Sequence, residues 1–185
     1  MNRALTLIAR ILALLGGFVL IALVLTTTFS IIGRSLNTIG HSDVMENIGW
    51  LGGLLRSFGP INGDYELVEA GVAIAIFAFL PWCQLSRTHA TVDVFTNFLG
   101  RRVNALLSLI WEIMLTAILF VVTWRISIGT SEKMRYGETT FLLQMPVWWP
   151  YAICTVIAGI AAVVGLYVVW QRLAELFAKE RPDAA

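Results

Sequence analysis

Four long apolar runs, separated by polar segments, dominate the pattern of the chain. They cover residues 11–32, 67–85, 103–124 and 148–170. A helix needs about 20 residues to cross a hydrocarbon core, and each run is of that length. Because backbone polar groups in lipid must be satisfied within the segment, we expect helices. The pattern predicts an all-α integral membrane protein, with four transmembrane helices in a single domain of residues 1–185.

Two connections are long enough to contain structure of their own. In the first, Gly33 to Tyr65, apolar residues recur at helical spacing and predict a short amphipathic helix at the membrane surface: Val44, Ile48, Leu51, Leu55 and Phe58. Three glycines at 49, 52 and 53 disfavour a helix there, so an extended lid or partner-binding loop is the alternative. The other connection, from about Arg125 to Val147, contains Gly129, Gly137 and Pro146 and is expected to be a turn-rich outer loop.

Composition supports lipid as the solvent of the chain. Hydrophobic residues make up 58% and charged residues 14% of the sequence, which is far from the balance of soluble proteins. The lipid bilayer is therefore a predicted partner, and nucleic acid is not. Arg3 and Arg10 precede the first run, which continues without a small-residue cleavage site and is expected to remain as a helix.

The placement of basic residues predicts the orientation. With both termini in the cytoplasm, eight of the 13 basic residues fall inside: Arg3, Arg10, Arg87, Arg101, Arg102, Arg172, Lys179 and Arg181. Cytoplasmic segments of membrane proteins carry an excess of Lys and Arg, so this topology is favoured. It places Cys83 and Cys154 on opposite sides of the membrane, beyond the reach of a disulfide.

The segment "RTHATVDVFTNFLGRR", residues 87–102, carries the residue types of an acid/base site. His89 and Asp93 are four residues apart and would share one face of a helix. No nucleophile motif, phosphate-binding glycine loop or set of metal ligands accompanies them. We therefore favour a structural role, in which the two side chains hold the inner hairpin together, over a catalytic one.

No cofactor is predicted for the chain. A haem held by two histidines is disfavoured because the two histidines, His41 and His89, lie on opposite sides of the predicted membrane. Glu112 is the one acid well inside a predicted membrane helix, which makes it a candidate functional residue. An interhelical hydrogen bond and proton or ion transfer are both open for it, and the first is favoured.

Acidic and aromatic residues mark the outer ends of two helices. Glu66 and Glu69 open the second helix, where negative charge complements the helix dipole. Trp148, Trp149 and Tyr151 open the fourth helix and are typical of a headgroup-layer anchor, with ligand stacking as the alternative.

Four motifs in order along the chain resemble those of a known family. They are "GR" at Gly33 and Arg34; "DYELVEA", with Glu66 and with Tyr65 in place of a second acid; "RTHATVDVF", with Arg87, His89 and Asp93; and "TFLLQMPVWWPY", with Thr140, Pro146, Trp148 and Tyr151. In this order and placement the chain resembles the small membrane subunit of tripartite ATP-independent periplasmic (TRAP) transporters, the DctQ-like family.

The resemblance implies a multi-pass protein of a bacterial inner membrane that is not an enzyme. Its implied partners are a large membrane subunit, which moves an organic acid with sodium, and a periplasmic substrate-binding protein. The small subunit would be a scaffold for the large one, and sodium would bind the large subunit rather than this chain. The competing hypothesis is a self-contained four-helix channel or membrane-embedded enzyme that uses His89, Asp93 and Glu112.

Overall fold

Four helices make up almost all of the structure, a computed structural model that describes residues 3–41, 59, 61–86 and 101–178. They are α1 (Arg3–Gly40), α4 (Asp64–Ser86), α6 (Arg101–Tyr136) and α7 (Trp148–Ala178). Each is long and apolar enough to cross a membrane. The predicted all-α fold with four transmembrane helices is therefore confirmed, and no strand occurs among the described residues.

Part of the predicted outer loop is helical, so the prediction of a loop from Arg125 to Val147 was wrong in its first half. Helix α6 continues to Tyr136. Gly129 does not end it, because membrane helices tolerate glycine. The helix ends instead at Gly137, whose positive φ of 62° and N–H bond to the Lys133 carbonyl, at 3.1 Å, form a left-handed cap.

The first connection is also shorter than predicted, because α1 continues past Gly33 to Gly40. Gly33 is buried within the helix rather than placed in a turn. Within this extension the hydroxyls of Ser35 and Thr38 donate to the carbonyls four residues earlier, at 2.9 Å each, and so have acceptors inside the helix. The predicted amphipathic helix over residues 44–58 lies outside the described residues.

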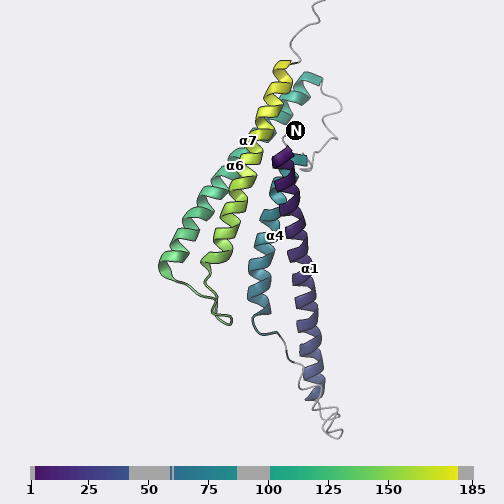
Figure 1. The fold of residues 1–185 in the computed structure, drawn as a ribbon, viewed down its shortest axis with the longest axis vertical. Coiled ribbons are helices and arrows are strands. Elements are labelled where there is room, and N and C mark those ends of the chain that lie inside the picture. The colour runs from purple at the N-terminus through teal and green to yellow at the C-terminus, as the bar shows by residue number, and fades with distance from the viewer. Residues whose placement is uncertain (1–2, 42–58, 60, 87–100, 179–185) are drawn as a thin grey trace, which may run out of the picture.

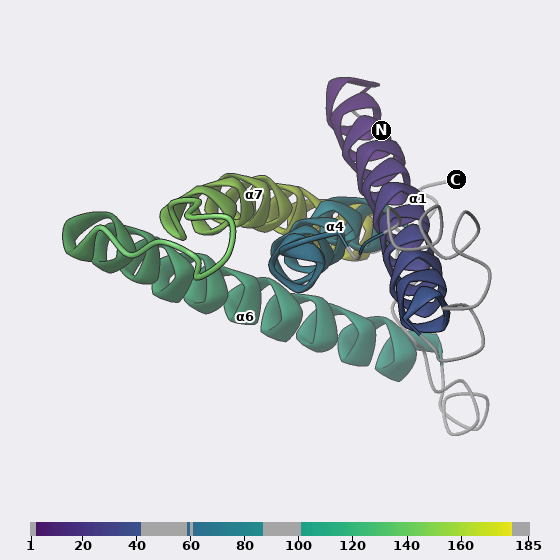
Figure 2. The ribbon, with the colours of Figure 1, turned by 90° about the horizontal axis from the view of Figure 1, so that it is seen from below.

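The helices form two pairs, α1 with α4 and α6 with α7, joined through contacts between α4 and α7. We call the end where α1 and α6 finish and α4 and α7 begin the loop end. Figure 1 shows that the two pairs diverge toward this end and converge toward the other, and Figure 2 shows α6 crossing the bundle at its edge. In α7, 44% of the most apolar stretch is buried inside the bundle, compared with 11% of the corresponding stretch in α1. Helix α7 is therefore the central helix.

The hydrophobic core lies in the converging half. Ala9 of α1, Leu85 of α4, and Val164 and Val168 of α7 form one buried cluster there. Each comes from the part of its helix that is remote from the loop end. Packing of apolar side chains therefore holds one end of the bundle, and the loop end needs other contacts.

A glycine allows α1 and α4 to approach closely. A Cβ added at Gly16 would lie 2.9 Å from the Cβ of Ala78 and 3.3 Å from the carbonyl oxygen of Ala75. Neither atom belongs to a flexible side chain that could move away. Small residues at such crossings let helix backbones pack in contact, which is a principal source of helix association in membranes.

Replacing Gly16 by leucine is expected to destabilise the α1–α4 pair. Overpacking of a tight contact costs about 1–3 kcal/mol, and thermal unfolding of the purified chain in mild detergent, followed by circular dichroism, would measure the loss. Gly17→Leu is the matched control, since no atom lies within 4 Å of a Cβ at that position. Equal midpoints for the two variants would contradict the assigned contact.

Candidate functional site

A compact turn between α6 and α7 forms one wall of the candidate site. Residues 138–147, which we call the 138–147 turn, fold back on themselves through an isolated bridge between Thr139 and Pro146. Thr140 N–H donates to the Met145 carbonyl at 2.9 Å, and Met145 N–H donates to the Thr140 hydroxyl at 3.1 Å. Gln144 adopts a positive φ of 53°. The turn is thus internally hydrogen-bonded, and several of its N–H groups face α4.

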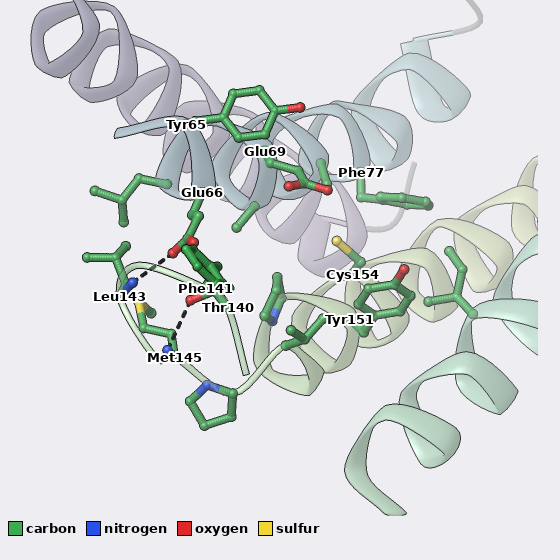
Figure 3. A pocket seen from close by; sticks show the side chains of 17 residues that line it. Tyr65, Glu66, Glu69, Phe77, Thr140, Phe141, Leu143, Met145, Tyr151 and Cys154 are labelled. Carbon is green, nitrogen blue, oxygen red and sulfur yellow. Dashed lines mark hydrogen bonds between the residues drawn. The ribbon is translucent and has the colours of Figure 1, made fainter. Parts of the chain in front are cut away.

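Glu66, in the first turn of α4, accepts hydrogen bonds from that turn. Its two carboxylate oxygens accept hydrogen bonds from the N–H groups of Leu142 at 2.7 Å and Leu143 at 2.9 Å. Figure 3 shows the second of these bonds. The hydroxyl of Thr140 and the N–H of Phe141 also interact with the carboxylate. Consecutive backbone N–H groups form an anion-binding concavity, and a carboxylate is a strong acceptor for it. We call this set of contacts the Glu66 clasp.

The clasp adds a contact that the sequence did not predict for Glu66. The carboxylate lies in the first turn of α4, where negative charge was expected to complement the helix dipole, and it also accepts hydrogen bonds from the 138–147 turn, 76 and 77 residues away in sequence. It joins the two helix pairs where they diverge. The fold thereby brings residues of two separate predicted motifs to one place: Glu66 from the first, and Thr140 and Pro146 from the second.

A second contact at the loop end involves an acid that the sequence analysis did not single out. The Ser30 hydroxyl of α1 donates to Asp64 Oδ2 at 2.5 Å, and Arg34 Nη2 lies 3.7 Å from the same oxygen. Asp64 begins α4, and an acid at the start of a helix is the signal that could have identified it. The guanidinium is 64% exposed, so the ion pair itself contributes little and the Ser30 bond positions the pair.

A cavity of about 670 Å³ lies behind the clasp, between α4 and α7. Apolar side chains form most of its wall, including Phe77 of α4, Ile126 of α6 and Cys154 of α7. Tyr151 and Pro146 line it as well, whereas Trp148 and Arg34 do not. Figure 3 shows Glu69 and Tyr151 on facing walls. A concave apolar space with a few polar groups has the character of a ligand site.

Glu112 lies in the converging half, away from the cavity. Its carboxylate oxygen Oε1 accepts a hydrogen bond from Gln84 Nε2 at 2.5 Å, and the two residues are 6% and 1% exposed. The bond crosses from α4 to α6. This geometry fits the interhelical hydrogen bond that the sequence analysis favoured for Glu112.

Among the predicted site residues not yet discussed, Trp148 lies in the part of the chain that the structure describes. Trp148 opens α7 and packs edge to face against Trp149, with ring centres 5.8 Å apart. Arg87, His89 and Asp93 lie outside the described residues. In the part of the chain that the structure describes, no group of three or more His, Cys, Asp or Glu side chains could hold a metal ion. Cys83 and Cys154 are free thiols.

These features define a multi-pass helical membrane protein whose loop end is tied together by carboxylate contacts. The family model described as the DctQ component of tripartite ATP-independent periplasmic transporters matches residues 48–175. The chain belongs to this family and is a small permease subunit of a TRAP transporter, which is a transporter component and not an enzyme. No curated protein and no solved structure matches the chain.

The matched range contains both sides of the Glu66 clasp. Glu66 and the 138–147 turn fall within residues 48–175, and so do α4 and α6. Helix α1, with Ser30 and Arg34, precedes the matched range. The Asp64 contact therefore joins a matched helix to one outside the match.

Replacing Glu66 by alanine is expected to release the 138–147 turn from α4. Phe141 is 88% exposed, so chymotrypsin should cleave at this turn several-fold faster once the turn is no longer held. Digestion of the purified chain, followed by mass spectrometry, would measure the rate. Glu69→Ala, one turn further along α4 and without a bond to the turn, is the control. Unchanged cleavage in Glu66→Ala would contradict the clasp.

Replacing Gln84 by leucine is expected to destabilise the bundle, because the Glu112 carboxyl loses its amide donor in a buried site. Interhelical hydrogen bonds in membranes are worth about 0.5–2 kcal/mol. The double variant Gln84→Leu/Glu112→Leu should recover part of the loss, since replacing both partners of a buried pair costs less than removing one. Thermal unfolding in detergent measures both. An equal or larger loss in the double variant would contradict the pairing.

Proposed function

We propose that this subunit is a scaffold for the large membrane subunit of its transporter, in a bacterial inner membrane with both termini in the cytoplasm. The large subunit carries an organic acid inward with sodium, and a periplasmic binding protein delivers the acid. Sodium binds the large subunit. Family membership supports this assignment, since the matching description names one component of a three-part system.

The observation that carries the proposal is the apolar stripe on α1. Leu14, Phe18, Ile21, Leu25 and Phe29 follow one another at helical spacing, and each is 52–70% exposed. Gly16 and Ser30, which contact α4, lie on the other side of the helix. From Leu14 to Phe29, α1 therefore offers a continuous apolar face that the described helices leave uncovered.

A comparable face runs along α6. Its most exposed large residues include Leu106, Ile110, Val121 and Trp124, between 53% and 62% exposed, whereas Leu109, Glu112 and Thr116 are buried. The bundle thus has an uncovered apolar side on each helix pair. Helix packing in membranes depends on shape-matched contact, and long uncovered faces provide the area that a multi-helix partner needs.

The test is to recover the chain with its neighbours from its native membrane. Photo-crosslinking residues are placed at Phe18 on α1 and at Ile110 on α6, followed by mild-detergent purification and mass spectrometry. We expect one large multi-helix protein in about equal amount, with a covalent adduct from at least one of the two positions. Ala75, which is fully buried, is the control position and should give no adduct with another protein.

Deletion of the chain should abolish uptake of one organic acid, and restoring the chain should restore uptake. A chain recovered alone or only as its own oligomer would contradict the proposal and favour a self-contained channel or enzyme. Uptake that continues unchanged after deletion would contradict it as well.

A further inference from the structure

The cavity behind the Glu66 clasp has no part in the proposed scaffold function, and its dimensions are informative. It is lined along α4 from Tyr65 to Phe77. Twelve residues of helix span roughly 18 Å, at about 1.5 Å per residue. One leaflet of the hydrocarbon core is about 15 Å deep, half of the roughly 30 Å total. The cavity therefore extends through about one leaflet, at the side of the membrane where the 138–147 turn lies.

The chemistry of the wall changes along this length. The deeper part is formed by Phe77, Ala73, Ile126 and Cys154, which offer apolar contacts. Glu69 and Tyr151 lie about one helical turn closer to the loop end than Ala73 and Cys154, and Glu66 and Thr140 line the cavity at the turn itself (Figure 3). A ligand that matches both parts of the wall is apolar in the deeper part of the cavity and polar in the part toward the turn, at the level of the headgroups. A volume of about 670 Å³ lies in the usual range of small-molecule sites.

The part of the cavity toward the 138–147 turn is negatively charged. Glu66 is engaged by the 138–147 turn, whereas Glu69 is exposed and forms no hydrogen bond or ion pair with the residues that the structure describes. A carboxylate near the hydrocarbon boundary is costly without a counter-charge. A cationic donor would be attracted to it, and an anionic group would be repelled by both acids.

We propose that this cavity binds one acyl chain of a phospholipid whose headgroup carries a primary ammonium, as in phosphatidylethanolamine, with the ammonium facing Glu69. An ammonium N–H donates a hydrogen bond to a carboxylate, which a quaternary choline cannot do. A glycerol headgroup leaves the lipid with a net negative charge and offers the acids no counter-charge. The proposed lipid site requires that the chain spans a bilayer. It is a second role, in addition to the scaffold function.

The first experiment compares lipids on the full chain, purified in mild detergent with whatever subunit accompanies it. Native mass spectrometry measures the lipid retained after addition of phosphatidylethanolamine, phosphatidylcholine or phosphatidylglycerol with identical acyl chains. We expect phosphatidylethanolamine to be retained at least about tenfold more tightly than phosphatidylglycerol, since one charge-assisted hydrogen bond suffices for that ratio. Equal retention of the three lipids, or none, would overturn the proposal.

Variants then separate the two parts of the cavity. Glu69→Gln is expected to remove the preference over phosphatidylglycerol, while Glu132→Gln, an exposed acid on α6, should keep it. Ala73→Trp should fill the cavity and abolish retention, while Ile76→Trp, on α4 but outside this cavity, should not. An unchanged preference in Glu69→Gln would overturn the proposal even if Ala73→Trp failed to fold. A chain that retains its large subunit but shows no lipid preference would overturn the lipid site and leave the scaffold function standing.

Discussion

The carboxylate of Glu66 is the contact on which the loop end of this bundle depends. At the opposite end, apolar side chains of three helices pack into a core, but toward the loop end α4 and α7 diverge. There, two consecutive backbone N–H groups of the 138–147 turn bind one carboxylate. Backbone N–H groups need hydrogen-bond acceptors, and the carboxylate supplies one oxygen to each of these two groups. The clasp forms one wall of the cavity between α4 and α7.

The sequence predicted the four spans well and their ends poorly, for one physical reason. Hydropathy detects the part of a helix that lies in hydrocarbon, whereas backbone hydrogen bonding continues beyond it. Arg125 to Tyr136 is polar enough to resemble a loop, yet the helix ends only where Gly137 adopts a left-handed conformation. Such a cap depends on one backbone angle, and Gly129 carries the same sequence signal without that conformation.

The parts of the candidate site also differed in how well the sequence predicted them. The motifs containing Glu66 and Thr140 were visible in the sequence, but their contact spans more than 70 residues and could not be derived from local pattern. Asp64 was missed because the expected position of a second acid was Tyr65, one residue later. The cavity could not be predicted at all, since it arises from the angle between two helix pairs rather than from any residue type.

The buried pair of Gln84 and Glu112 has a consequence for how the chain enters the membrane. An acid near the middle of a spanning helix raises the cost of inserting that helix by about 3 kcal/mol when it enters by itself. The amide that meets this carboxyl belongs to the preceding helix, which leaves the ribosome first. If α4 remains beside the insertion site until α6 arrives, the two helices can enter the lipid as one hairpin, with the acid already partnered. Because Gln84 precedes Glu112 along the chain, the order of the two residues favours insertion of α4 and α6 as one hairpin.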